Sequence, residues 1–291
     1  MISVSASEID QVPLPFLEAL NEALRAEESV HRLIFSPEFT TFKERRPASV
    51  LCVTNSRGLM ALKEQSGTIT IRDAVFNEIL AIELTVILLH GKLKIDFARN
   101  AECQSTALYF NTVAIPKYYA AVCEILGASS QGGSTSPDRK PSVRFPEWPH
   151  KFRNFAILYT PPASYLLDGA FSGAVYGRLF GEKAPATAVL ITERDLIIIA
   201  EERSGSWFPP KDSEKYGALM TYIPRQRLIQ WETTPGRRVD LHQLQILAGR
   251  GIQKFQFPLS PECRDRVRRI SDQVIGVCSA LAEKRVGRSA D

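Results

Sequence analysis

The stretch ASVLCVTNSRGLMALKE, residues 48–64, contains two apolar runs that are split by the polar residues 55–58. Apolar and β-branched runs on both sides of a short polar turn predict a β-hairpin. Gly58 lies in the turn and tolerates the positive φ that tight turns often need. We therefore expect two antiparallel strands here.

A second stretch, ATAVLITERDLIIIAEE at residues 186–202, has the same pattern around a polar turn at 192–195. Further strand-like segments follow each hairpin, at 79–89, 92–98 and 106–112 in the first half and at 227–233, 239–247 and 252–259 in the second. Each half then ends in an amphipathic helix opened by a proline, Pro116 or Pro261. The same order of elements in both halves indicates a duplicated module.

Short antiparallel strands with no βαβ alternation favour a small barrel or an orthogonal sandwich, and one helix after the last strand would close an open end. We predict a mainly β (α+β) chain of two small antiparallel barrels, each capped by a C-terminal helix. The polar stretch ASSQGGSTSPDRKPS at 128–142 is typical of a flexible linker. The predicted parts are a helical segment at 1–27, with its helix at 15–25, module 1 at 28–127, the linker at 128–145, and module 2 at 146–291.

The strings VLCVTNSRGLMAL (50–62) and AVLITERDLIII (188–199), together with the closing helices, resemble the bacterial PH-like and GRAM-like domains of the pleckstrin-homology-like superfold. The resemblance covers roughly residues 28–127 and 170–285 and implies seven strands and one helix per module. It implies binding modules with no catalytic residues. Lipid-binding members hold phosphoinositide headgroups with a Lys…Arg-x-Arg pattern, which is missing from the comparable stretch of module 2 at 178–184. The comparable stretch of module 1, at 43–46, has three cations and an acid.

Composition and charge restrict the class of protein. The chain has 291 residues, 44% of them apolar and 23% charged, as in ordinary globular proteins. Residues 1–127 carry 12 Lys and Arg against 15 Asp and Glu, whereas residues 128–291 carry 24 against 17. The second half is therefore the basic one. A basic face of this size favours an anionic partner, but it equally serves solubility or pairs with the acidic first half. Nucleic acid is not expected, since no aromatic-rich nucleic-acid motif accompanies the arginines.

The cysteines and the apolar windows predict the compartment. The five cysteines are odd in number and show no CxxC spacing, so buried, reduced thiols are expected. The first ten residues lack the basic and apolar regions of a secretory signal. The most apolar window, 155–177, is interrupted by Pro161, Pro162 and Asp168, so no membrane span is expected. The prediction is a cytoplasmic protein that acts free in solution or at the periphery of a membrane.

The sequence predicts no arrangement of catalytic residues. The four histidines, His31, His90, His150 and His242, are scattered without metal-ligand spacing. The sequence holds no GxSxG elbow, P-loop or GxGxxG motif. We accordingly expect no catalytic residue, no metal site and no cofactor.

Arginines near the turns of the second half form the candidate binding site. The site combines four arginines with a loop, SGSWFPPKDSEKY at 204–216, that carries two aromatic residues beside a lysine. If these aromatic side chains are exposed they can contact a membrane interface or a partner; the alternative is that they fold back onto their own barrel. Its residues are Arg225, Arg227, Arg237, Arg238, Trp207, Phe208 and Lys211. A competing hypothesis places the anionic contact on the last helix, at Arg264, Arg266, Arg268 and Arg269.

Together these observations predict a non-enzymatic binding or scaffolding protein whose second module contacts a protein partner or an anionic membrane surface. The alternative is a small-molecule-binding protein or enzyme with a site in the barrel or between the modules, lined by His242, Gln243 and Gln245. A third possibility is a homo-oligomer that pairs through an exposed edge strand at 79–89.

Overall fold

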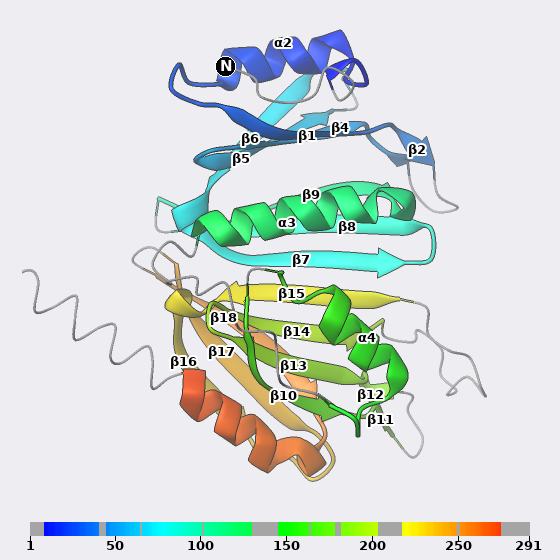
Figure 1. The fold of residues 1–291 in the computed structure, drawn as a ribbon, viewed down its shortest axis with the longest axis vertical. Helices are drawn as coiled ribbons and strands as arrows, with labels where there is room; N and C mark the ends of the chain where they lie inside the picture. The colour runs from blue at the N-terminus through cyan, green and yellow to red at the C-terminus, as the bar shows by residue number, and fades with distance from the viewer. Residues whose placement is uncertain are drawn as a thin grey trace, which may run out of the picture. The chain divides into compact units, whose positions relative to one another are not determined.

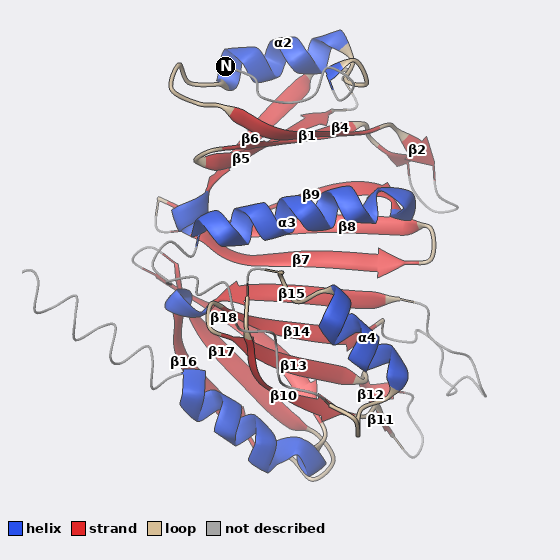
Figure 2. Ribbon diagram, viewed as in Figure 1, coloured by secondary structure: helices blue, strands red, loops and turns tan. Residues whose placement is uncertain are grey.

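A computed structural model describes residues 9–40, 45–64, 66–100, 102–129, 145–162, 164–177, 182–202, 217–248 and 251–274. The chain divides into two compact units, unit 1 from Met1–Arg99 and Cys103–Gln131, and unit 2 from Asn100–Glu102 and Gly132–Asp291. Strands predominate in both units, with a few helices (Figure 2). The protein is therefore mainly β, of the α+β class, as predicted.

Unit 1 contains a four-stranded and a three-stranded antiparallel sheet. The first has the order β1-β4-β5-β6 and the second the order β7-β8-β9 (Figure 1). Their bounds are β1 Val30–Ser36, β4 Ser49–Thr54, β5 Arg57–Lys63, β6 Ile69–Val75, β7 Ile79–Ile87, β8 His90–Arg99 and β9 Glu102–Asn111. A small hairpin, β2 Phe39–Thr40 and β3 Arg45–Arg46, follows β1. Helix α2 (Leu14–Ala23) precedes the strands, and α3 (Ile115–Ser129) ends the unit.

Unit 2 repeats this arrangement. Its four-stranded sheet has the order β10-β13-β14-β15 and its three-stranded sheet the order β16-β17-β18. The bounds are β10 Leu166–Ser172, β13 Thr187–Thr192, β14 Asp195–Glu201, β15 Ala218–Pro224, β16 Leu228–Thr234, β17 Asp240–Ala248 and β18 Gly251–Leu259. The hairpin here is β11 Val175–Tyr176 and β12 Glu182–Ala184. Helix α4 (His150–Leu158) precedes the strands, and a helix over 264–274 follows them.

Both predicted hairpins are confirmed, and a threonine closes each turn in the same way. The Thr54 hydroxyl accepts from the N–H groups of Ser56 and Arg57 at 3.2 and 3.1 Å. The Thr192 hydroxyl accepts from those of Arg194 and Asp195 at 3.2 and 2.8 Å. Side-chain oxygens of this kind stabilise turns by replacing a backbone acceptor. Arg57 and Asp195, which begin strands β5 and β14, are therefore equivalent positions.

The strands do not form the closed barrels predicted from the sequence. In the parts of the chain that the structure describes, each strand pairing belongs to an open sheet. A 3-10 turn lies where each unit passes from its four-stranded to its three-stranded sheet, η1 (Phe76–Glu78) in unit 1 and η3 (Arg225–Arg227) in unit 2. In the described ranges β6 does not pair with β7, and β15 does not pair with β16, so the continuous hydrogen-bond ladder that a closed barrel requires is interrupted at these turns.

Helices on both faces explain the unbroken apolar runs of the hairpins. All six residues of β4 are buried, although an antiparallel strand with one solvated face would alternate. Val50 and Cys52 pack against Phe16 and Leu20 of α2, which covers β5 and β6, whereas α3 contacts β1 and β7 (Figure 1). The predicted N-terminal helix is thus confirmed and belongs to the core of unit 1.

Helix α4 covers unit 2 in the same way and was not predicted. Pro149, Phe152 and Ala156 repeat the spacing of Pro13, Phe16 and Leu20. The Phe152 ring lies 4.8 Å from that of Phe171 on β10. A Cβ on Gly169 would meet a Phe145 carbon at 2.7 Å, so glycine allows Phe145 to approach β10. The repeated module accordingly begins with a helix, and the predicted module 1 boundary at residue 28 omits that helix.

The structure also differs from the expectations for the start of the linker and for one cysteine. Helix α3 runs to Ser129, so the first residues of the predicted linker are helical, and residues 130–144 lie outside the described ranges. The Cys103 side chain is exposed although buried thiols were expected, whereas Cys52 and Cys263 are buried. None of the helices in the described ranges is long and apolar enough to cross a bilayer.

Candidate binding surface

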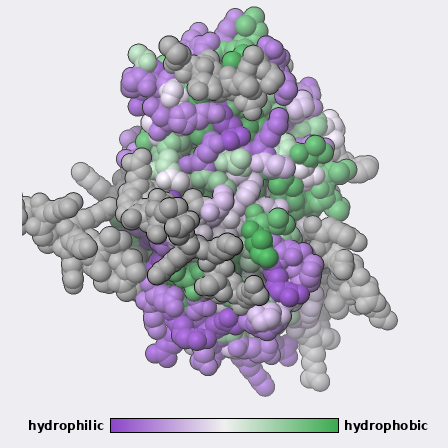
Figure 3. Space-filling model, in the orientation of Figure 1, coloured by the Kyte–Doolittle hydropathy of each residue, from purple (hydrophilic) through white to green (hydrophobic). Residues whose placement is uncertain are grey.

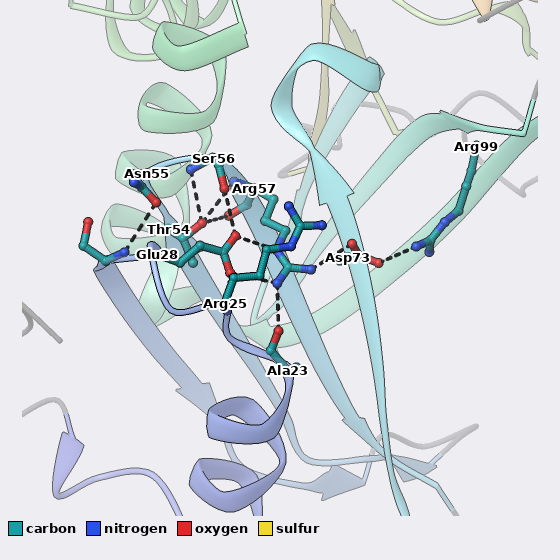
Figure 4. A network of polar contacts seen from close by, with 10 residues as sticks. Ala23, Arg25, Glu28, Thr54, Asn55, Ser56, Arg57, Asp73 and Arg99 are labelled. Carbon is teal, nitrogen blue, oxygen red and sulfur yellow. Dashed lines mark hydrogen bonds and ion pairs between the residues drawn. The ribbon is translucent and has the colours of Figure 1, made fainter. Parts of the chain in front are cut away.

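Arg57 lies in a buried polar network at the end of the first hairpin (Figure 4). Its Nε and Nη2 donate to the two carboxylate oxygens of Glu28 at 2.7 and 2.8 Å, and its Nη1 donates to Asp73 at 3.0 Å. Nη2 also donates to the Ala23 carbonyl at 2.8 Å. The hydrogen bonds from Arg57 lower the pKa of Glu28 to about 2. The network ties the end of α2 to β5 and β6 and therefore stabilises the fold.

Asp195 occupies the equivalent position in unit 2 without such a network. Its side chain is buried, and neither carboxylate oxygen has a hydrogen-bond partner in the structure. Burial, and to a smaller extent the charge of Glu193, raise the pKa of Asp195 to about 7, although Arg194 and Arg225 act in the opposite direction. A buried carboxyl without donors favours its neutral form. Asp195 is therefore the titratable group of unit 2 to examine around neutral pH.

His242 on β17 is enclosed by aromatic side chains. Its Nδ1 accepts from the Trp231 indole at 3.2 Å and lies 3.0 Å from the Thr233 hydroxyl. The ring stacks on Phe257 at a centroid distance of 5.4 Å. Burial lowers the pKa of His242 to about 4, so the imidazole is neutral at physiological pH.

The alternative site at His242, Gln243 and Gln245 is not assembled. Neighbouring residues of a strand point to opposite faces, and His242 therefore lies opposite the two glutamines. The Gln243 and Gln245 amides both donate to Glu232, at 3.3 and 3.2 Å. The three side chains do not line one pocket.

We predict that the His242 imidazole titrates with a midpoint near pH 4, as followed by its ring nitrogen signals in NMR. The unfolded pKa is 6.5. Because the folded pKa is the lower one, His242 makes the fold lose stability as the pH falls from 6.5 through about 4. Comparison with His242→Gln assigns the signal, and a midpoint close to 6.5 would contradict the buried environment.

Cationic side chains gather at the turn between β16 and β17. Arg237 and Arg238 are exposed there and form no ion pair with any described residue. Asp240, buried at the start of β17, accepts from the Gly236 N–H at 3.0 Å and binds Arg264 of the last helix at 2.7 and 2.8 Å. The turn is thus held against the helix, with Arg237, Arg238 and Arg264 at one end of unit 2. We call these three residues the basic turn.

The structure brings only part of the predicted site together. Arg225 is buried, and its guanidinium donates to the Thr192 and Gln273 carbonyls at 2.8 and 2.9 Å. Arg225 and Arg227 lie in η3 before β16, whereas Arg237 and Arg238 follow it. A seven-residue strand spans about 20 Å, so these arginines form no single cluster. Trp207, Phe208 and Lys211 lie outside the described residues.

The four arginines of the competing hypothesis, on the last helix, also do not form one exposed cluster. Arg264 and Arg266 bind Asp240 and Glu147, while Arg268 and Arg269 are exposed. The missed signal was the pair Asp240 and Arg264, which lie far apart in the sequence. An acidic residue at the start of a buried strand indicates that a cationic side chain pairs with it. The sequence does not show which of the basic residues forms that ion pair.

Neither the metal-ligating side chains nor a comparison with known proteins assigns a reaction or a ligand to this chain. Among the residues that the structure describes, no group of three or more His, Cys, Asp or Glu side chains is placed to hold a metal ion. Compared with known proteins, the chain matches no protein-family model and no curated sequence.

Proposed function

We propose that this chain is a non-enzymatic binding protein of two PH-like modules, and that the basic turn of unit 2 contacts an anionic membrane surface. The observation that carries the proposal is the exposure of Arg237 and Arg238 without ion-pair partners in the described residues, on a turn fixed by Asp240 and Arg264. Exposed arginines held on a rigid turn attract an anionic surface at little entropic cost.

The repeated architecture supports the PH-like assignment. The four-stranded and three-stranded sheets of each unit together have seven strands, and a closing helix follows them; seven strands and one C-terminal helix are what the resemblance implies. The positions also agree in detail, because a register shift falls between Val30 and Arg32 of β1 and between Leu166 and Asp168 of β10. Bulges at equivalent positions are a feature that duplicated modules keep.

The packing of unit 2 favours a binding surface over an internal site. Large side chains fill the space between its sheets and helix, among them Leu244, Ile246, Leu259, Val267 and Ile270, each at most 1% exposed. Tightly packed interiors leave no room for a small molecule. The proposed contact is therefore on the outside of the unit.

We expect the double variant Arg237→Ala/Arg238→Ala to bind anionic vesicles roughly thirtyfold more weakly than the natural chain at low salt. Each surface cation contributes about 1 kcal/mol of attraction to an anionic membrane, and 1.4 kcal/mol is tenfold. Co-sedimentation with phosphatidylserine-containing and neutral vesicles measures the effect. The part of the binding that the basic turn contributes is expected to disappear at about 0.5 M salt, where screening is strong.

Arg268→Ala/Arg269→Ala is the matched control, since it removes two charges from the exposed face of the helix in the same unit. It should retain most of the vesicle binding. Equal losses in both variants would assign the attraction to net charge and reject the basic turn. If the natural chain does not bind vesicles at all, the membrane proposal fails and a protein partner becomes the hypothesis to test.

A further inference from the structure

Three aliphatic side chains are exposed together at one end of unit 1. Leu88 and Leu89 form the turn between β7 and β8, and Val113 lies in the 3-10 turn η2 (Thr112–Ala114); they are 65%, 66% and 86% exposed. Thr112 joins the two turns, because its N–H donates to the Leu89 carbonyl at 3.2 Å and its hydroxyl to the Leu88 carbonyl at 2.9 Å. We call Leu88, Leu89 and Val113 the apolar tip.

The apolar tip is the part of the predicted edge strand that is exposed. Residues 79–89 were expected to present apolar side chains along an open strand, but Ile79, Leu80, Ile82 and Leu84 are buried. Figure 3 shows hydrophobic side chains at the edge of the molecule over the β7–β8 turn. The exposed apolar surface is therefore the projecting turn at the end of β7, and the side chains along the strand itself are buried or half-buried.

The backbone conformation of Leu88 is a second indication that the apolar tip binds something outside its own fold. Its φ is 49°, in the left-handed region, where a two-residue hairpin turn normally uses Asn or Gly. A leucine destabilises such a turn and gains no burial within its own fold. The corresponding turn of unit 2 carries Pro235, Gly236, Arg237 and Arg238 instead, so the architecture does not require an apolar tip.

Basic residues and an absence of acids surround the apolar tip in the sequence. His90 and Lys92 follow the turn on β8, and Lys117 follows Val113 by one helical turn. Residues 84–95 and 103–123 contain no Asp or Glu. Lys92 and Lys117 form no ion pair with a described residue. Nearby, Phe39 stacks on His90 at 6.0 Å, and its neighbour Glu38 binds Arg45 at 2.6 Å.

We propose that the apolar tip inserts into the headgroup region of an anionic lipid bilayer, with Lys92 and Lys117 facing the lipid phosphates. A projecting aliphatic turn with a cationic rim matches the order of chemistry across a membrane interface, with anions outside and hydrocarbon within. The proposal depends on unit 1 alone, so it stands or falls separately from the basic turn of unit 2.

The test is vesicle binding by the full chain at about 0.5 M salt, where electrostatic attraction is screened and apolar insertion is not. With vesicles of about 30% phosphatidylserine in phosphatidylcholine, we expect Leu88→Ser/Leu89→Ser to lower the partition coefficient by about tenfold or more. Leu14→Ser is the matched control, because Leu14 of α2 is also 65% exposed. Equal binding of the double variant and the natural chain, or equal loss in the control, overturns the proposal.

A gain-of-signal variant separates insertion from a general loss of folding. Leu89→Trp in a Trp207→Phe background should be quenched by lipids brominated in the acyl chain, beyond the quenching of that background, whose remaining Trp148 and Trp231 are buried. No added quenching overturns insertion. If Leu88→Ser/Leu89→Ser instead lowers the molar mass in light scattering while vesicles bind neither form, a second copy covers the apolar tip and the membrane proposal is rejected. The result for the basic turn, measured with Arg237→Ala/Arg238→Ala, concerns only the vesicle binding that is lost at high salt. The two proposals can therefore fail independently.

Discussion

Replacing Arg57 with methionine is expected to lower the free energy of unfolding of unit 1 by about 3–5 kcal/mol. Arg57 supplies the charge and the donors for both Glu28 and Asp73, whose side chains are 1% and 17% exposed. Methionine fills similar volume but leaves Glu28 without its cation in a buried site, while Asp73 keeps only Arg99. The loss should be visible as a lower midpoint in denaturant unfolding with an unchanged slope.

Two further variants distinguish the network from simple loss of charge. Arg99→Met removes the other cation that binds Asp73, but this side chain is 46% exposed, so we expect a loss of at most about 1 kcal/mol. Adding Glu28→Gln to Arg57→Met removes one unpaired charge and should restore part of the lost stability. Similar losses for Arg57→Met and Arg99→Met would show that burial does not strengthen the Arg57 interactions.

Acid provides an independent check on the same network. The folded pKa of Glu28, about 2, lies below its unfolded value of 4.5. The stability that this carboxylate contributes is therefore complete above pH 4.5 and is lost as the pH falls through about 2. In Arg57→Met the main cause of the lowered pKa is gone, and the contribution of Glu28 to acid sensitivity should shrink or reverse.

The local pattern of the sequence predicted the strands, and long-range contacts decided the rest. The hairpins were predictable because Thr54 and Thr192 close their turns with hydrogen bonds to residues two and three positions away. Helix α4 was missed because its apolar side chains merge with the apolar window that follows. Only the equivalence of Phe16 and Phe152 reveals it, and that equivalence requires the repeat to be extended in front of the first strand.

The binding residues were less predictable than the strands for a geometric reason. Sequence proximity grouped Arg225 with Arg237, but a whole strand separates them. Arg225 turns inward to backbone carbonyls, a role that composition does not distinguish from that of a solvated arginine. The apolar tip combines Leu88 with Val113 through Thr112, and no local pattern predicts such a contact between two turns.

Asp195→Asn is expected to gain stability relative to the natural chain as the pH rises, by about 4 kcal/mol in total between pH 3.8 and 7. The pKa of Asp195 is about 7 in the fold against 3.8 when unfolded. Over this interval the unfolded chain releases a proton that the folded chain retains, so the stability of the natural chain decreases with pH. Asparagine has no proton to release, and the difference between the two proteins isolates this carboxyl group.

The pH dependence, not the absolute stability, is the diagnostic quantity. Asparagine brings an amide into the same buried site and adds an offset that is constant with pH, because the amide does not ionise in this range. Ile197→Val on the same strand is the control: it shortens a fully buried side chain and should cost about 1 kcal/mol at every pH. If the stability difference between Asp195→Asn and the natural chain is also independent of pH, Asp195 is ionised in the fold and forms an ion pair with a cationic side chain. Arg194 and Arg225 are the candidates, since both already act to lower its pKa.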